Sequence, residues 1–270
     1  MNEAVSWRPY DLSDDPTVVG DVRVSDRLSD ERLESPRRLL ASLPPSYGSS
    51  DECYPVLYMH DGLNLFDERT SYSGEWQVDE TMERLSDEGI EAIVVGVPNA
   101  DDSRATEYVP YQHDEREGGN ADSYLSFLVE RVKPLVDERF RTREGRDSTG
   151  IAGSSLGGLV SLYGFFEYPE TFGFAGVMSP AFWWTDGEIF DYVRAQERVS
   201  GKLYVDVGGD ERPDDPERSR EYRADAERMV ELLREKGYGE SALRFVLEEG
   251  ANHHESAWAR RFPEMVRFLL

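Results

Sequence analysis

The residue of this chain with the clearest potential for nucleophilic chemistry is a serine at the centre of a G-x-S-x-G pattern. The pattern runs Gly153-Ser154-Ser155-Leu156-Gly157, between an apolar run and a helix-like run. A hydroxyl on a sharp strand-to-helix turn needs neighbours without a Cβ atom two residues away on each side, because the backbone is tight there. Ser155 has them, whereas Ser154 has Ala152 and Leu156 at those positions. The pattern therefore predicts Ser155 as a nucleophile, provided that an acid and a histidine follow it.

A serine hydroxyl is a poor nucleophile at neutral pH unless a base takes its proton. The histidines of the chain are His60, His113, His253 and His254. In the strand–turn–helix arrangement the order is serine, acid, histidine, so the base is expected late in the chain. That leaves His253 and His254, and the one that is not the base can cap the last helix.

The acid is expected just after the apolar run Leu203–Val207. The acidic residues there are Asp210, Glu211, Asp214 and Asp215. In so acidic a chain a loop carboxylate carries little information, so local reasoning leaves the four equal.

Two backbone N–H groups must bind the oxyanion that forms during acyl transfer. One is that of Leu156, at a helix N-terminus. The other is expected from the loop His60–Asp67, where Gly62 allows a tight turn. His60-Asp61 also resembles a metal-binding pair, but no third ligand accompanies it, so we expect no metal and no other cofactor.

The elements that must position these groups alternate between strand and helix. Strands are predicted at 18–24, 38–43, 55–60, 90–97, 172–178, 202–207 and 243–247, and helices at 76–88, 121–140, 156–168, 216–236 and 255–270, with Pro134 bending the second. This alternation predicts an α/β fold in one domain, residues 1–270: a mostly parallel, doubly wound sheet with helices on both faces. The irregular stretches 98–120 and 179–187 are expected to line the crevice.

Composition limits the partners and the compartment. The 270 residues carry a formal net charge of -25, which repels nucleic acid and anionic membranes. No apolar run has the length of a membrane span, and the first residues lack the pattern of a signal peptide. Cys53 is the only cysteine, so no intrachain disulfide forms. We expect a cytoplasmic protein whose partner is a small-molecule substrate; its oligomeric state stays open.

Basic residues are almost all arginine, because Lys133, Lys202 and Lys236 are the only lysines. A large acidic excess with few lysines is typical of proteins from salt-accumulating microbes, where concentrated cations screen the self-repulsion. The alternative is an ordinary acidic enzyme from a genome rich in arginine codons. We favour the halophilic interpretation.

From about Val18 to its C-terminus the chain resembles an esterase family of α/β-hydrolases. That family includes enterochelin (ferric-siderophore) esterases, feruloyl esterases, esterase D-type enzymes and mycolyltransferases. The matching segments, in order, are Leu43-Pro-Pro-Ser-Tyr47, Pro55 to Gly62 with Asn64-Leu-Phe-Asp67, Trp76-Gln-Val-Asp-Glu80, Arg104 with Glu107-Tyr108, Gly153 to Gly158, Ser179-Pro-Ala-Phe-Trp183, and His253-His-Glu255 with Ala257-Trp258.

The resemblance implies an answer where local chemistry left alternatives. The family's spacing from histidine to tryptophan, here Trp258, implies that His253 is the base. Its pattern of glycine, two residues and an acid starts at Gly208 and implies Glu211, with Asp210 as the reserve. It also implies Leu63 as the second oxyanion donor, at a position where close relatives often have glutamine.

The resemblance implies a serine carboxylic ester hydrolase that forms an acyl-enzyme on small or medium esters, siderophore-type esters among them. Alternatives are an acyltransferase of the mycolyltransferase type and a non-catalytic binding domain on the same fold. Arg104, Glu107 and Tyr108 are interpreted as substrate contacts or a structural ion pair. Phe182, Trp183 and Trp184 are interpreted as a substrate wall or a packed corner.

The halophilic interpretation predicts that salt stabilises the fold. We expect the thermal unfolding midpoint to rise between dilute buffer and molar KCl, because added cations screen the repulsion among surface carboxylates. Circular dichroism at a series of KCl concentrations measures it. Equal stability in dilute buffer and in molar KCl would contradict the interpretation.

Overall fold

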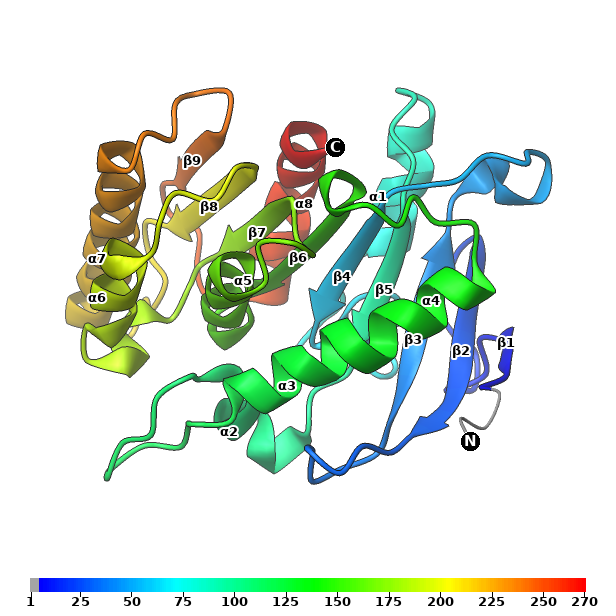
Figure 1. Ribbon diagram of the computed structural model, residues 1–270, viewed down its shortest axis with the longest axis horizontal. Helices are drawn as coiled ribbons and strands as arrows, with labels where there is room; N and C mark the ends of the chain where they lie inside the picture. Colours follow the sequence, from blue (N-terminus) through cyan, green and yellow to red (C-terminus); the bar gives the residue numbers. More distant parts are fainter. Residues whose placement is uncertain (1–4) are drawn as a thin grey trace.

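In the computed structural model, which describes residues 5–270, the strands form one twisted sheet (Figure 1). The strand order is β1-β2-β3-β5-β4-β6-β7-β8-β9. The strands are β1 (Trp7–Pro9), β2 (Asp21–Leu28), β3 (Arg37–Leu43), β4 (Val56–His60), β5 (Ile93–Val97), β6 (Thr149–Ser154), β7 (Phe174–Met178), β8 (Lys202–Gly208) and β9 (Leu243–Glu248). Pairing is antiparallel from β1 through β3 to β5 and parallel from β5 to β9. The predicted α/β class with a mostly parallel sheet is confirmed.

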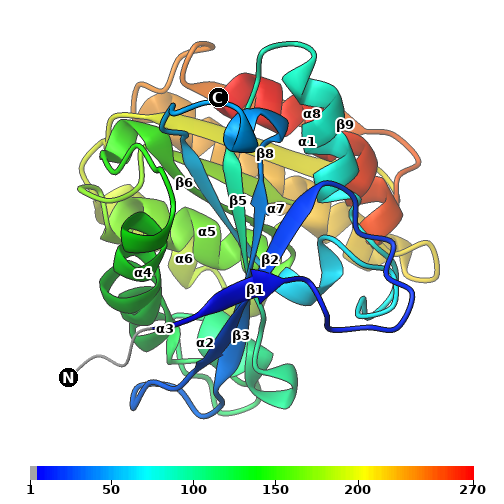
Figure 2. The ribbon, with the colours of Figure 1, turned by 90° about the vertical axis from the view of Figure 1, so that its right-hand side faces the viewer.

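Helices cover both faces of this sheet, which is seen edge-on in Figure 2. They are α1 (Val78–Ser86), α2 (Arg104–Tyr108), α3 (Ala121–Phe127), α4 (Lys133–Arg139), α5 (Leu156–Glu167), α6 (Glu188–Ala195), α7 (Pro216–Glu235) and α8 (Glu255–Leu269). The core on one face contains apolar side chains of α1 and α8, and that on the other face contains those of α2 to α7. No helix among residues 5–270 combines the length and the apolar character that crossing a bilayer requires.

The central strands are apolar throughout because both of their faces are buried. On β4, Val56 and Tyr58 enter one core while Leu57 and Met59 enter the other. A strand with one face in water would alternate apolar and polar residues, whereas a strand covered on both faces does not. Because strands β4 to β9 all run in parallel, their carboxyl ends lie at one edge of the sheet, where the loops of the site gather.

The structure also differs from the sequence expectations. Strand β1 and helix α6 were not predicted, and α2 lies within the stretch 98–120, which was expected to be irregular. The predicted helix 121–140 is interrupted by a π-helical turn at Leu128–Val132, directly before Pro134. Because proline lacks an N–H and crowds the preceding turn, a widened turn at this point accommodates it.

All three lysines donate to backbone carbonyls, and two of them do so at the end of a helix. The Nζ of Lys202 donates to the carbonyls of Phe268 and Leu269, at 2.9 and 3.2 Å, at the end of α8. That of Lys236 donates to the carbonyls of Arg194 and Gln196 at the end of α6. Lys133 donates to the carbonyl of Glu144 at 2.9 Å. At the ends of α6 and α8 a cation satisfies carbonyls that no helical N–H can reach.

A partly buried acidic cluster lies at the start of α1. One side-chain oxygen each of Glu75, Asp79 and Glu80 lies within 4.8 Å of the others, and each residue has a buried oxygen without a hydrogen-bond partner. Burial raises the pKa of Glu75 to about 7 and that of Asp79, which also interacts with Glu80, to about 9. The other oxygen of Asp79 accepts the Val19 N–H at 2.8 Å. At neutral pH the cluster therefore holds protons.

We expect Asp79→Asn to stabilise the fold increasingly as the pH rises. The pKa of Asp79 in the folded chain, about 9, lies far above that of an unfolded aspartate, about 4. The folded state therefore binds the proton more tightly, so wild-type stability falls as the pH rises from about 4 to about 9. Asparagine mimics the neutral carboxyl and still accepts the Val19 N–H. Denaturant unfolding at pH 5 and pH 8, with exposed Asp87→Asn as the control, measures the difference; a gain that does not depend on pH would refute the account.

Candidate active site

Ser155 occupies a strained turn between β6 and α5. Its φ of 58° and ψ of -122° lie in a region that residues with a Cβ atom rarely adopt. A Cβ on Gly153 would lie 3.0 Å from the His60 ring and the Gly157 backbone, and one on Gly157 would lie 3.3 Å from His60. The close approach of β4 therefore leaves little room for a side chain at either glycine of the pattern, beside the turn that carries Ser155.

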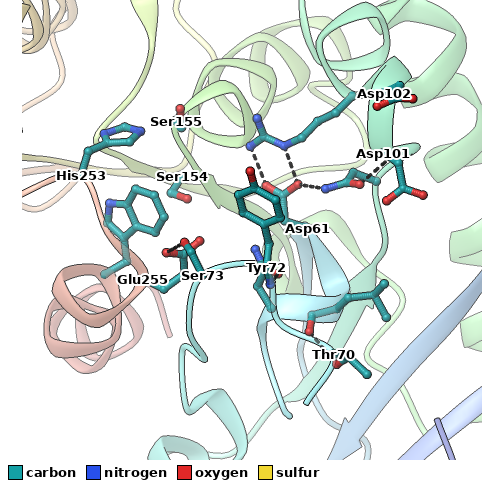
Figure 3. Close-up of a pocket in the computed structure, with 15 residues that line it drawn as sticks. Asp61, Thr70, Tyr72, Ser73, Asp101, Asp102, Ser154, Ser155, His253 and Glu255 are labelled. Carbon is teal, nitrogen blue, oxygen red and sulfur yellow. Dashed lines mark hydrogen bonds and ion pairs between the residues drawn. The ribbon is translucent and has the colours of Figure 1, made fainter. Parts of the chain in front are cut away.

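A cavity of about 650 Å³ opens beside Ser155. Leu63, Ser154, Ser155, His253 and Trp258 are among the residues that line it. Figure 3 shows the imidazole of His253 on the same side of the cavity as Ser155. Ser155 and His253 are far apart in the sequence, and the structure places both in the lining of one cavity.

Glu211 holds the ring of His253. The Nδ1 of His253 lies 2.7 Å from Oε2 of Glu211, and the backbone N–H of His253 donates to the Glu211 carbonyl at 2.9 Å. Glu211 is 1% exposed. Burial alone would raise its pKa, but hydrogen bonds from His253, Ser179 and the Gly208 N–H outweigh burial and lower the pKa below its usual range. The carboxylate is therefore charged at neutral pH.

The alternatives in the sequence occupy other positions. The Nδ1 of His254 accepts the Ser256 N–H at 3.1 Å and caps α8. Asp210 is exposed, and Asp215 caps α7 by accepting the Arg218 N–H at 3.0 Å. Asp214 is exposed too. Of the four candidate acids and the two late histidines, Glu211 and His253 are the two that share a side-chain hydrogen bond.

Both proposed oxyanion donors lie at the start of a helical turn. Leu156 is the first residue of α5, and the first N–H groups of a helix have no acceptor within it. Leu63 lies in the 3-10 turn Gly62–Asn64, whose first bond runs from the Asn64 N–H to the Asp61 carbonyl at 2.9 Å. A Cβ on Gly62 would lie 2.6 Å from the Gly96 carbonyl carbon, so glycine is required there.

A buried hydroxyl fixes the orientation of Glu211, and sequence reasoning gave Ser179 no role. Its Oγ accepts N–H bonds from Trp258 at 3.0 Å and from Arg261 at 2.8 Å. The single proton of the hydroxyl is left for Glu211, whose Oε1 lies 2.6 Å away. Arg261 in turn pairs with buried Asp206 at 3.2 Å.

Tyr222 of α7 also belongs to the site without a signal in the sequence. Its ring centroid lies 5.0 Å from that of His253, with the two ring planes tilted by 48°. It is 4% exposed, and burial raises its pKa. In the sequence it is one of several apolar residues on the inner face of an amphipathic helix.

The candidate substrate contacts divide into two groups. Arg104 lines the cavity and binds Asp61 through two bonds, at 2.7 and 2.8 Å. Glu107 forms a buried ion pair with Arg37 at 2.8 Å. The Tyr108 hydroxyl accepts the Asp61 N–H at 3.2 Å. The ion-pair interpretation therefore fits both charged residues, Arg104 with Asp61 and Glu107 with Arg37, and Arg104 also lines the cavity.

The aromatic run lies outside the lining of the cavity. Phe182 is fully buried in the core, and Trp183 packs on Tyr222 with ring centroids 6.1 Å apart. The indole N–H of Trp184 donates to the Glu117 carbonyl at 3.0 Å. The packed-corner interpretation fits these positions.

His60 and Asp61, the pair considered as metal ligands, each interact with another side chain of the protein. His60 is buried, its Nδ1 bonds the Tyr124 hydroxyl at 2.7 Å, and burial lowers its pKa to about 3. Asp61 pairs with Arg104. The carboxylate cluster at Glu75, Asp79 and Glu80 is the group with metal-ligand spacing among residues 5–270.

Comparisons with known proteins agree with this architecture. Residues 30–269 match the family model described as "Putative esterase". The uncharacterized protein YbbA of Bacillus subtilis is 26% identical over 240 residues, 86% of this chain and 92% of the relative. A siderophore enterobactin esterase of Emericella nidulans is 34% identical over 83 residues, which cover 31% of this chain and 27% of that protein.

Solved structures share the fold at low sequence identity. The BES protein from Bacillus cereus superimposes with a TM-score of 0.72 at 19% identity, over 96% of this chain and 98% of that one. The siderophore hydrolase EstA from Aspergillus nidulans gives 0.72 at 18% identity, over 92% and 95%. Since the family model spans most of the chain, this protein belongs to the "Putative esterase" family, carboxylic ester hydrolases on an α/β-hydrolase-type fold.

Proposed function

We propose that this protein is a serine esterase in which Ser155, His253 and Glu211 form the catalytic triad. The observation that carries the proposal is the 2.7 Å bond between His253 Nδ1 and Glu211, together with the presence of His253 and the strained Ser155 on one cavity. With Nδ1 bound to a carboxylate, the neutral ring carries its proton there, and Nε2 is the free acceptor.

In the first half of the reaction Ser155 becomes acylated. Its Oγ attacks the ester carbonyl carbon as His253 Nε2 takes the hydroxyl proton. The N–H groups of Leu63 and Leu156 bind the oxygen of the tetrahedral intermediate. When the carbon–oxygen bond to the alcohol breaks, His253 returns the proton to the leaving alcohol, and the acyl group stays on Ser155.

In the second half water replaces the alcohol. His253 takes a proton from the water as its oxygen attacks the acyl carbon, and collapse of the intermediate returns the proton to Ser155 Oγ. One ester and one water thus yield one acid and one alcohol. Glu211 stays ionised and stabilises the imidazolium in both halves. A cavity of about 650 Å³ suits a small or medium ester, and relatives named as siderophore esterases support such a substrate.

Labelling with a fluorophosphonate tests the nucleophile. We expect wild type and Ser154→Ala to be labelled and Ser155→Ala to stay unlabelled, because the reagent bonds to an activated serine Oγ. Ser154 is the matched control, since it lines the same cavity one residue earlier. His253→Ala should lower kcat on a p-nitrophenyl ester about 10⁴-fold or more, whereas His254→Ala should retain it. Full labelling of Ser155→Ala would refute the triad.

Ser179 should act as a positioning residue for Glu211. Ser179→Ala removes one hydrogen bond to a buried carboxylate, so we expect kcat/KM to fall about 10- to 100-fold. The acidic limb of the profile of kcat/KM against pH should move to higher pH. With one hydrogen bond fewer, the Glu211 charge stabilises the protonated imidazole of His253 more strongly. Ser179 has a φ of 39°, so Ser179→Gly removes the hydroxyl without strain and separates kinetics from stability. Wild-type kinetics in both variants would contradict this role.

A further inference from the structure

The charges that line the cavity are not balanced. Four carboxylates, those of Asp61, Asp101, Asp102 and Glu255, face one guanidinium, that of Arg104. The two bonds between Arg104 and Asp61 neutralise that pair, and Asn99 supplies a further bond to Asp61 at 2.7 Å. The cavity wall therefore offers an anionic substrate no free positive side chain.

Asp101 and Asp102 extend into solvent on one side of the opening. They begin the 3-10 turn Asp101–Ser103, which follows β5, and both are exposed. The Asp101 N–H donates to Asn99 Oδ1 at 2.9 Å, which ties the turn to the cavity wall. The salt bridges found between residues 5 and 270 involve neither carboxylate. Both charges are thus available to a ligand.

Glu255 contributes a third carboxylate on the opposite side. It is 6% exposed, and one of its oxygens accepts the Ser73 hydroxyl at 2.5 Å. Figure 3 shows Glu255 and Ser73 on the His253 side of the cavity, and Asp101 and Asp102 across from them. Carboxylates therefore line the cavity on both sides.

Tyr72 adds an aromatic face to the same opening. It lines the cavity and is 93% exposed, and it is the one exposed large hydrophobic residue found among residues 5–270. Figure 3 places it between the two acidic sides. Aromatic faces bind ammonium groups through the ring quadrupole, and neighbouring carboxylates add Coulomb attraction. An aromatic ring among unpaired carboxylates is thus suited to a cation.

We propose that this esterase selects esters that carry a positively charged group, an ammonium held by Tyr72 and the carboxylates of Asp101 and Asp102. The inference rests on the proposed function, because it assigns the substrate class of the same site. At low ionic strength, where screening is weak, the net charge of -25 acts in the same direction at longer range, since it attracts cationic esters and repels anionic ones.

Matched substrates test the selectivity. One series has p-nitrophenyl esters whose acyl chain ends in trimethylammonium, in its uncharged tert-butyl isostere, or in a carboxylate. A choline thioester and its tert-butyl isostere place the charge on the leaving group instead. Each kcat/KM is divided by the rate of hydroxide hydrolysis of the same ester, which removes intrinsic reactivity. We expect the normalised kcat/KM of the cationic ester to exceed that of its uncharged isostere about tenfold or more in at least one series. The normalised kcat/KM of the anionic ester should be lower than that of the uncharged isostere.

Variants show whether the named side chains cause the preference. Asp101→Asn/Asp102→Asn should reduce the ratio of cationic to neutral ester severalfold, and asparagine tolerates the positive φ of Asp101. Tyr72→Leu should reduce the ratio as well, while Tyr72→Phe should keep it. The matched control is Asp51→Asn/Glu52→Gln, which removes two exposed charges before β4, at the opposite end of the strand from the site. This control should leave the ratio unchanged.

The outcomes separate this inference from the proposed function. All proteins are compared at one KCl concentration at which their circular dichroism spectra coincide. If wild type hydrolyses no ester of either series and resists fluorophosphonate, the proposed function fails. If it hydrolyses the neutral esters with a ratio near one, or favours the anionic ester, only the charge selectivity is overturned. An unchanged ratio in both Asp101→Asn/Asp102→Asn and Tyr72→Leu overturns the assigned side chains.

Discussion

A buried negative charge is the constraint on which the site depends. A carboxylate that is 1% exposed is stable only when hydrogen bonds replace its water, and Glu211 obtains them from Ser179, the Gly208 N–H and His253. Three segments meet to supply them: the end of β7, the end of β8 and the loop before α8. The same bonds that keep the charge in place also orient the imidazole, so stability and chemistry share one network.

Parallel topology explains why such distant segments meet. Strands β6, β7 and β8 pair in parallel, so the loops that follow them emerge at one edge of the sheet. Ser155 comes from the first of these loops, Ser179 from the second and Glu211 from the third. The loop after β9 then brings His253 to the same edge. Four loops at one edge of the sheet thus bring Ser155, Ser179, Glu211 and His253 together.

The sequence predicted what depends on local patterns. Apolar periodicity located the central strands and long helices, and the spacing of Gly153 and Gly157 indicated the turn at Ser155. It could not find Ser179 or Tyr222, because their roles arise from residues far away in the chain. The acidic residues were too numerous to tell apart, because the sequence contains 55 Asp and Glu residues. Burial distinguishes Glu211 from Asp210 and brings Glu75 close to Asp79, and it is visible only in three dimensions.

The lysines show how an acidic chain uses its scarce ammonium groups. The side chains of Lys133, Lys202 and Lys236 all donate to main-chain carbonyls, those of Lys202 and Lys236 at helix ends and that of Lys133 in the loop after α4. An ammonium is a compact donor of three hydrogen bonds, and carbonyl oxygens here take the place of its hydration shell. Reagents that acylate side-chain amines would therefore act on the joints between elements more than on the outer surface, so amine-directed immobilisation or crosslinking of this protein would attach at points that hold its architecture together.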